Sequence, residues 1–355
     1  MPKNRAALLC PYCHSELITK YGKRKIKRTI VQVYKCQTCS KYFSDKKLKY
    51  KSYAIKTILN ALSCYNLGYT LEQAKKQLAK RLHQTVPCST LCSWVTQYKD
   101  TCTYHRLREQ AKQLYSPDFI IFSKKFYHEQ VYNFQVHKAK LGLLFEDTEF
   151  SKHKKFLPVK EYLEKVPTEN FPHHIFGPKE SCPEDQKTEN RASQLKICLL
   201  PAIKLSKNNL ANKLAELALQ LAKNNKERHE KVQRFMLVND STTVAVEVPV
   251  YLTHDDIGYF KERNFALNFE NYRTPLTGHI DILQIRNNSI HILDYKPEAE
   301  KEKKAVKQLT VYALALASRT KLPLSCFKCA WFDEKNYYEF FPLHCVYTKK
   351  ANQNI

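Results

Sequence analysis

Two aspartates and a lysine near the C-terminus have the types and spacing of residues that hydrolyse phosphodiester bonds. Two apolar runs meet at Asn287-Asn288, a dipeptide that tolerates the positive φ angles of a two-residue β-turn. If that turn sets the register, Asp281 lies directly opposite Asp294, and Lys296 points to the same face. Opposed like charges destabilise a β-ladder. A divalent metal ion between them would turn this cost into a site for hydrolysis.

The elements that must position this hairpin predict a compact α/β unit over residues 201–347. A helix is expected over about 208–235, followed by a strand over 244–251 and then the hairpin. A second helix is expected over 299–318 and a last strand over 327–340. Two helices would then cover one sheet.

Four short motifs on these elements resemble the PD-(D/E)XK nuclease superfamily, within it the RecB-like branch. They are Gly278-His279-Ile280-Asp281, Leu293-Asp294-Tyr295-Lys296, Gln308-x3-Tyr312 on the second helix, and His229 on the first. Each motif alone is weak, but the four occur in the expected order. The resemblance implies an αβββαβ core.

The same resemblance implies the roles of these residues. The Mg²⁺ or Mn²⁺ ligands would be Asp281, Asp294, His229 and the carbonyl of Tyr295. Together with the two aspartates, the catalytic residues would be Lys296, Gln308 and Tyr312. The lysine would orient the attacking water and help to deprotonate it, while Gln308 and Tyr312 would position the lysine or the nucleic-acid backbone. Glu247 and His279 are weaker candidates.

Two C-x2-C pairs predict a structural zinc site in residues 1–50. The pairs are separated by 22 residues, and the four thiols are Cys10, Cys13, Cys36 and Cys39. Such pairs supply the four soft ligands of tetrahedral Zn²⁺, which leaves no open position for chemistry. The segment is similar to the zinc ribbons that open many transposases, including the aromatic pair Tyr42-Phe43.

Three helical patterns over residues 51–100 predict a trihelical helix-turn-helix that binds DNA. The second helix should begin at Thr70, with Gln73 completing a capping box. The segment looks like the unit that follows the zinc ribbon in transposase-like proteins. The expected outward contacts to DNA are Ser89, Thr90, Ser93 and Gln97. A three-helix protein-interaction bundle is the alternative.

The charge of the chain favours a polyanion as partner. The formal net charge is +25, and residues 1–50 carry 13 Lys or Arg against two acidic residues. The basic run in this segment comprises Lys23, Arg24, Lys25, Lys27 and Arg28. No apolar run approaches the length of a membrane span, so no membrane partner is expected, and a cytoplasmic location is expected, nucleoid-associated in a prokaryote. Residues 101–200 form a middle region of unassigned fold, in which 119–122 and 131–136 look like strands and 177–191 looks like an exposed linker.

The sequence therefore predicts a multidomain α+β protein that acts as a metal-dependent DNA nuclease. The zinc ribbon and the helix-turn-helix would deliver the nuclease domain to DNA, as in mobile-element or genome-processing proteins. Two alternatives stay open. The first is a DNA-binding regulator or transposase-like protein whose nuclease domain is catalytically silent, and the second is a nuclease directed at RNA. Oligomeric state and cleavage polarity are not indicated.

Overall fold

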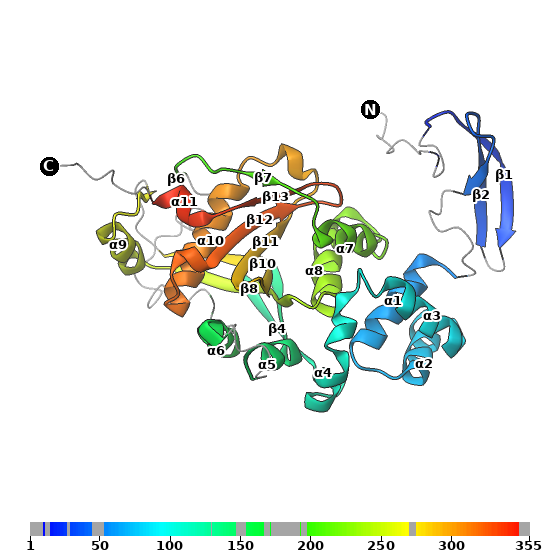
Figure 1. Cartoon of the computed structure of the whole chain (residues 1–355), viewed down its shortest axis with the longest axis horizontal. Helices are drawn as coiled ribbons and strands as arrows, with labels where there is room; N and C mark the ends of the chain where they lie inside the picture. The colour runs from blue at the N-terminus through cyan, green and yellow to red at the C-terminus, as the bar shows by residue number, and fades with distance from the viewer. Residues whose placement is uncertain are drawn as a thin grey trace. The chain divides into compact units, whose positions relative to one another are not determined.

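The computed structural model describes most of the chain as two compact units, residues 1–58 and 59–355. The described residues are 10, 15–26, 29–44, 53–128, 130–146, 154–166, 171, 192, 197–269 and 275–347. The expected linker at 177–191 lies outside them. Figure 1 shows the course of the chain.

The first unit contains a three-stranded antiparallel sheet. Its strands are β1 (Ile18–Ile26), β2 (Thr29–Cys36) and β3 (Tyr42–Ser44), in the order β1-β2-β3. β2 ends at Cys36 and so leads directly into the second cysteine pair. The turn after β2 holds Cys39, so the sheet itself fixes where the second thiol pair lies.

The second unit opens with the three helices predicted from the sequence, although only from Leu59 onward does the first of them belong to this unit. They are α1 (Ile55–Asn66), α2 (Leu71–Leu82) and α3 (Cys88–Tyr98). The capping box at the start of α2 is confirmed, because Gln73 and Thr70 bond each other's backbone N–H. A short 3-10 helix, η1 (Thr103–Arg106), and α4 (Arg108–Leu114) follow.

An eight-stranded mixed sheet forms the centre of the second unit in the described part of the chain. The strand order is β4-β5-β8-β10-β11-β12-β13-β7. The bounds are β4 (Ile121–His128), β5 (Gln130–His137), β7 (Leu205–Ser206), β8 (Thr243–Leu252), β10 (Leu276–Arg286), β11 (Ser289–Tyr295), β12 (Phe327–Phe332) and β13 (Tyr337–Phe340). β11 and β12 pair in parallel and the other neighbours are antiparallel. Two strands from the unassigned middle region, β4 and β5, thus extend the predicted nuclease sheet. A separate small ladder joins β6 (Ile197–Cys198) to β9 (Asn268–Phe269).

Helices pack on both faces of this sheet. α10 (Ala305–Thr320) packs on β8, β10, β11 and β12, and it shares a buried apolar core with α5 (Lys138–Glu146) and α6 (Leu157–Lys165). α8 (Arg228–Asn239) packs on β5 and β8, with α7 (Leu210–Leu219) beside it. Further elements in the described part of this unit are α9 (His254–Glu262), α11 (Pro342–Val346), η7 (Asn225–Glu227), η8 (Ala299–Lys301) and η9 (Leu324–Cys326).

The hairpin register predicted from the Asn-Asn turn is confirmed. Asn287 and Asn288 have φ values of 49° and 56°, as a two-residue turn with left-handed residues requires. Arg286 pairs with Ser289, and the ladder continues in that register to Ile282 and Leu293. Asp281 and Asp294 are the next residues on the two strands.

Three predicted elements were wrong in their bounds. The single helix over 208–235 is two helices, because Asn224 caps the backbone of Glu227 and starts a new turn after a polar run. The last strand is a hairpin, in which Asp333 accepts hydrogen bonds from the backbone N–H groups of Lys335 and Asn336. The helix predicted over 299–318 is α10, which begins later, at Ala305, after the short turn of η8.

Candidate active site

The two predicted aspartates and the lysine come together on neighbouring strands. Asp281 on β10 and Asp294 on β11 each stand one residue beyond the ladder pair of Ile282 and Leu293, so the two carboxylates face each other across the strands. Lys296 follows β11, and its Nζ lies 2.9 Å from Asp294 Oδ2. Both oxygens of Asp294 are nevertheless buried without a hydrogen-bond partner, because the ammonium is close but poorly aligned.

A third carboxylate, Glu247 on β8, completes this group. In the ladder between β8 and β10, Ile280 pairs with Val248 and Ile282 with Val246, so Glu247 stands across from Asp281. Its backbone is left-handed, with φ 52°, a strained value for a non-glycine residue inside a strand. The sequence analysis ranked Glu247 low, although one acid inside the apolar run Val244–Val250 was a signal for it.

Helix α8 brings two side chains to these carboxylates. Nδ1 of His229, in the first turn, lies 3.6 Å from Asp281 Oδ2. Nε2 of Gln233, one turn later, donates to Glu247 Oε1 at 2.6 Å. Residues four apart share one face of a helix, so the helix can place both side chains against the strands at once. Gln233 was missed by the sequence analysis, which followed the histidine alone.

Helix α10 supports the lysine from the other side. Nζ of Lys296 donates to Gln308 Oε1 at 3.5 Å, and Nε2 of Gln308 donates to the Tyr312 hydroxyl at 2.9 Å. The Tyr312 ring lies directly on Gly278 of β10, where an added Cβ would come within 2.2 Å of the ring. A glycine is therefore required at this position for the helix and the strand to approach so closely.

The three carboxyl groups differ in the direction of their pKa shifts. Burial, together with the charge of Asp281, raises the pKa of Asp294 well above its ordinary value. Burial and the charge of Asp281 likewise raise the pKa of Glu247 to about 8. Burial alone would raise the pKa of Asp281 too, but His229, Asp294 and the charge of Lys296 together outweigh burial and lower it. Asp281 is thus the group that carries the negative charge most readily.

These residues fit a hard divalent cation. Carboxylate oxygens, a carbonyl and an imidazole are donors that Mg²⁺ and Mn²⁺ accept. Both Asp294 oxygens are buried, and so buried a carboxylate requires nearby positive charge or a proton; Lys296 supplies part of that charge and a bound cation would add to it. The Tyr295 carbonyl is adjacent in sequence, and its side chain is buried with the ring 5.2 Å from that of His229. His279 instead packs its ring on Tyr132, at 3.8 Å between centroids.

The comparison with protein families agrees with this geometry. The match is to the PD-(D/E)XK nuclease superfamily. It covers residues 174–336, which include Asp281, Asp294 and Lys296. The resemblance to this superfamily is thereby confirmed, while the RecB-like branch stays a prediction, and the superfamily indicates a phosphodiesterase. No curated protein and no solved structure matches the chain. The matched range leaves out the two N-terminal segments, so their functions remain predictions.

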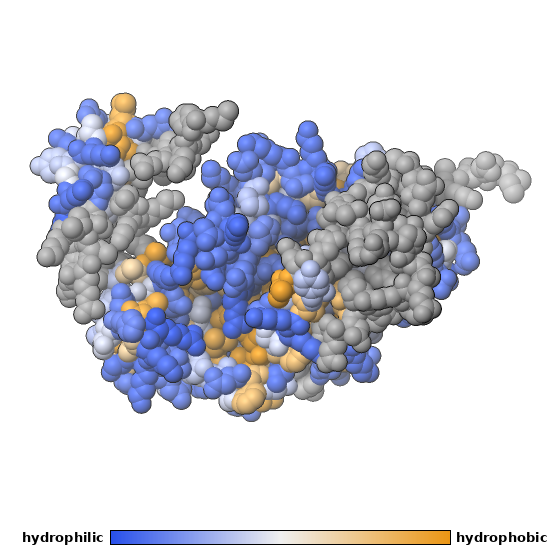
Figure 2. All heavy atoms as spheres, turned by 180° about the vertical axis from the view of Figure 1, so that it is seen from behind, coloured by the Kyte–Doolittle hydropathy of each residue, from blue (hydrophilic) through white to orange (hydrophobic). Residues whose placement is uncertain are grey.

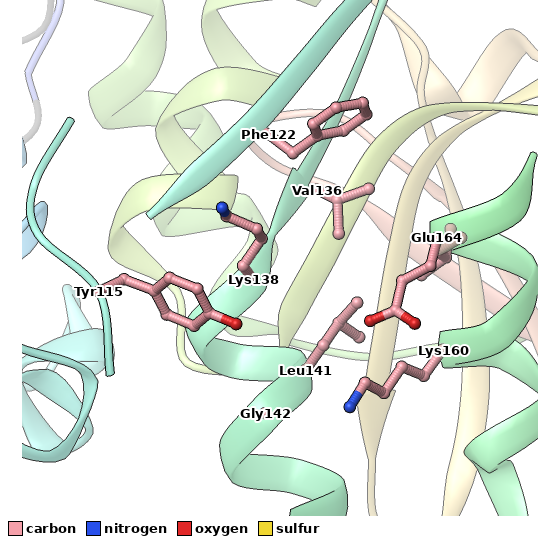
Figure 3. A pocket seen from close by; sticks show the side chains of 9 residues that line it. Tyr115, Phe122, Val136, Lys138, Leu141, Gly142, Lys160 and Glu164 are labelled. Atoms are coloured by element: carbon pink, nitrogen blue, oxygen red, sulfur yellow. The ribbon is translucent and has the colours of Figure 1, made fainter. Parts of the chain in front are cut away.

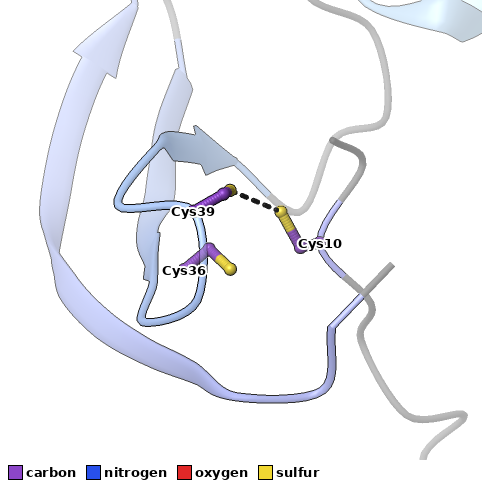
Figure 4. A group of neighbouring side chains, drawn as sticks. All are labelled: Cys10, Cys36 and Cys39. Atoms are coloured by element: carbon purple, nitrogen blue, oxygen red, sulfur yellow. Dashed lines mark hydrogen bonds between the residues drawn. The ribbon is translucent and has the colours of Figure 1, made fainter. Parts of the chain in front are cut away.

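Three of the four predicted zinc ligands lie together in the first unit. Cys10, Cys36 and Cys39 have ligand atoms within 4.8 Å of one another, and the thiols of Cys10 and Cys39 are 3.6 Å apart (Figure 4). Cys13 lies outside the described residues. A group of converging thiolates is a set of ligands that suits Zn²⁺.

The side chains predicted to contact nucleic acid are mostly exposed where they are described. Lys23 and Arg24 are exposed on β1, while the side chain of Lys25 and both Lys27 and Arg28 lie outside the described residues. On α3, Ser89, Ser93 and Gln97 are exposed and Thr90 is half-buried. Hydrophilic residues cover much of the face seen in Figure 2. Within the described residues, no helix has the length and apolar character that a membrane span requires.

A pocket elsewhere in the second unit does not coincide with the carboxylates. Its walls come from β4, β5, α5, α6 and the residue after α4, and they include Tyr115, Phe122, Lys138, Lys160 and Glu164 (Figure 3). None of the predicted catalytic residues lines it. The carboxylates lie instead on the central strands β8, β10 and β11.

Proposed function

We propose that this protein is a Mg²⁺- or Mn²⁺-dependent DNA nuclease whose active site is centred on Asp281, Asp294 and Lys296. The observation that carries the proposal is the pair of adjoining carboxylates beside a lysine, with both Asp294 oxygens buried and unbonded. The family match over residues 174–336 supports it, since members of this superfamily typically use Mg²⁺ or Mn²⁺.

The chain's own residues divide the work of hydrolysis. Asp281, Asp294, His229 and the Tyr295 carbonyl would hold the ion. A bound divalent cation neutralises the scissile phosphate and lowers the pKa of a water molecule. Burial lowers the pKa of Lys296, but the charges of Asp294 and Asp281 outweigh burial and raise it. Lys296 is therefore a cation that orients the attacking water and stabilises the negative charge that develops on phosphate.

Gln308 and Tyr312 act through the lysine. The hydrogen-bonded series from Tyr312 to Gln308 to Lys296 fixes where the ammonium lies. Such support limits the motion of a long, flexible side chain and keeps it in a reactive position. We assign both residues a positioning role.

The N-terminal segments would target the enzyme. We propose that Cys10, Cys13, Cys36 and Cys39 hold a structural Zn²⁺ in a zinc ribbon, and that α1, α2 and α3 form a DNA-binding helix-turn-helix. Exposed Lys23 and Arg24 and exposed Ser89 and Ser93 support contact with phosphates and bases. A nuclease with such modules fits a mobile-element or genome-processing role in the cytoplasm or nucleoid.

Cleavage of linear and circular DNA with Mg²⁺, Mn²⁺ or EDTA tests the proposal. Metal-dependent cleavage is expected for the wild type and for the control Asp255→Asn, which alters an exposed aspartate of α9. Asp294→Asn and Lys296→Ala should each lose activity by about 100-fold or more, as removal of a group that stabilises the transition state does. Thermal melts should show that Mn²⁺ still stabilises Lys296→Ala but stabilises Asp294→Asn less.

The alternatives predict other results. A catalytically silent scaffold would bind DNA without metal-dependent cleavage in any variant. A nuclease directed at RNA would cleave RNA in preference to both DNA forms. Wild-type cleavage by Lys296→Ala would show that the proposed site is wrong.

A further inference from the structure

The hairpin of β4 and β5 presents one polar and aromatic face. Ser123 pairs with Gln135, Lys125 with Asn133, and Tyr127 with Val131. Directly paired residues point to the same side of a sheet. We call this side the hairpin platform; it comprises Ser123, Lys125, Tyr127, Val131, Asn133 and Gln135. Tyr127 is 65% exposed and Val131 is 66% exposed.

The opposite side of the same hairpin is anchored in the core. Phe126 and Phe134 are buried, and the Phe126 ring stacks on Tyr132 at 5.6 Å between centroids. On the platform side, the Ser123 hydroxyl donates to Asn133 Oδ1 at 2.7 Å. The exposed aromatic side chain therefore stands on an ordered strand pair and not on a loose loop.

The platform is continuous with the candidate active site. Nη1 of Arg234 on α8 donates to Gln135 Oε1 at 3.0 Å, and Arg234 directly follows Gln233, which bonds Glu247. Gln135 also pairs with Val246, the neighbour of Glu247. A polymer that lies across the carboxylates can thus continue onto the platform.

The chemistry of the platform suits a polyanion with flat apolar groups. Lys125 and Arg234 supply positive charge, and the described residues of the hairpin, 121–128 and 130–137, include no acidic side chain. An exposed tyrosine provides a surface on which an unpaired base can stack. In a duplex the base faces are covered by their neighbours, so this platform favours a single strand.

We propose that the hairpin platform binds a single-stranded segment of DNA next to the cleavage site. A base stacks on Tyr127, and Lys125 contacts a backbone phosphate. The proposal rests on the nuclease function proposed above, and it names the form of the substrate that reaches the carboxylates.

Photocrosslinking of the full chain tests the proposal without cleavage. A single-stranded thymidine oligonucleotide carrying 5-iododeoxyuridine is irradiated with the zinc-loaded protein in a buffer free of Mg²⁺ and Mn²⁺, and tryptic peptides are mapped. A crosslink is expected in the peptide of residues 126–138, which contains Tyr127. Tyr127→Ala should weaken binding of the oligonucleotide about tenfold, as loss of one stacked base does, and should change duplex binding little.

Tyr259→Ala is the matched control, because Tyr259 is 51% exposed on α9, away from the platform. It should bind the oligonucleotide as the wild type does. Lys125→Ala should lower the salt slope of single-strand binding by about 0.7, the contribution of one phosphate contact.

The platform assignment fails if the crosslinks fall only in other peptides or if Tyr127→Ala binds the single strand as tightly as the wild type. An equal loss of single-strand and duplex binding would also overturn it. Because these measurements are made without Mg²⁺ or Mn²⁺, they are independent of catalysis. Metal-dependent cleavage together with a failed platform test would leave the nuclease proposal standing.

Discussion

At the residue scale, Glu247 combines backbone strain with a buried carboxyl group at the candidate site. It is the one acid in the apolar run Val244–Val250, with a left-handed backbone, a hydrogen bond from Gln233 and a position opposite Asp281. Strain and a buried carboxyl both cost stability, and such costs are found most often at functional sites. We infer that Glu247 contributes to the site through its charge, because it stands across from Asp281 and each charge acts on the other carboxyl group.

The raised pKa of Glu247 predicts a pH-dependent stability in the metal-free protein. Its folded-state pKa of about 8 exceeds the ordinary value of 4.5, so the folded state binds more protons than the unfolded state between these values. This contribution to stability is complete below pH 4.5 and is lost as pH rises toward 8. In EDTA, the wild type's free energy of unfolding, measured with urea, should fall between pH 5 and pH 8. In Glu247→Gln this fall should be smaller by about 1–3 kcal/mol.

A parallel pH dependence in the two proteins would contradict the raised pKa. Asp294, whose pKa is raised as well, is present in both proteins, so the difference between them isolates Glu247. The variant keeps the acceptor for Gln233, because its amide oxygen replaces Glu247 Oε1.

The sequence predicted the site residues of the hairpin, but not the site residues that neighbouring elements contribute. Asn287 and Asn288 specify their own turn, and the period of two in the strands then fixes which side chains oppose one another. Asp281, Asp294 and Lys296 follow from these local rules. Glu247 and Gln233 do not, because their positions depend on how β8 pairs with β10 and how α8 crosses β8, which are contacts between distant segments.

At the scale of elements, α8 connects the candidate site to the helical region before the sheet. Its first turn carries His229, beside Asp281. Its last residue, Asn239, accepts a hydrogen bond from Asn66 of α1 at 2.9 Å and donates to the Ser63 hydroxyl at 3.1 Å. Buried hydrogen bonds between side-chain amides favour one arrangement of two helices. In another arrangement, an amide left without a partner would lower the stability of the fold by about 1–3 kcal/mol.

The boundary between α7 and α8 could not be read from the apolar pattern. Apolar residues at helical spacing run through both helices, and the polar residues between them are good helix formers apart from Asn224 and Asn225. The asparagine cap at Asn224 determines the break. The same holds for β4 and β5, whose alternating residues predicted strands but not the sheet that they join.

The contact between β10 and α10 supplies a prediction at this scale. Gly278→Ala places a Cβ against the Tyr312 ring, and Tyr312 is too buried to move freely. The displaced ring should disturb Gln308 and, through it, Lys296. We expect a loss of stability of about 1–3 kcal/mol, typical of overpacking, and at least a tenfold loss of cleavage rate.

Gly258→Ala on α9 is the control for this substitution. An added Cβ at Gly258 has no heavy atom within 4 Å, and alanine favours a helix over glycine. Its stability should equal or exceed that of the wild type. Full activity in Gly278→Ala would show that the position of Tyr312 has no bearing on catalysis.

At the scale of the whole molecule, the first unit should bind zinc independently of the catalytic metal. The converging thiols of Cys10, Cys36 and Cys39 belong to this unit, while the carboxylates belong to the second. Cys36→Ser should lose one equivalent of zinc by elemental analysis and weaken DNA binding, yet keep cleavage of non-specific DNA at high protein concentration. Cys326→Ser, which alters a half-buried thiol of the second unit, should keep its zinc. Zinc retained by Cys36→Ser at one equivalent would refute the site.

The net charge of +25 predicts that contacts to phosphates dominate the affinity for duplex DNA. Each phosphate that a cation neutralises releases counterions, so affinity falls with salt by about 0.9 logarithmic units per contact and per tenfold increase in salt. Neutralising Lys23, Arg24, Lys25, Lys27 and Arg28 together removes up to five such contacts. The slope of log K against log salt should therefore fall by up to ~4.5 in magnitude, as measured by fluorescence anisotropy with a labelled duplex. Replacing the exposed lysines Lys261, Lys321 and Lys335 of the second unit should change the slope little. If the slope is unchanged in the five-residue variant, or falls equally in the three-lysine variant, the main path of DNA lies along the second unit instead.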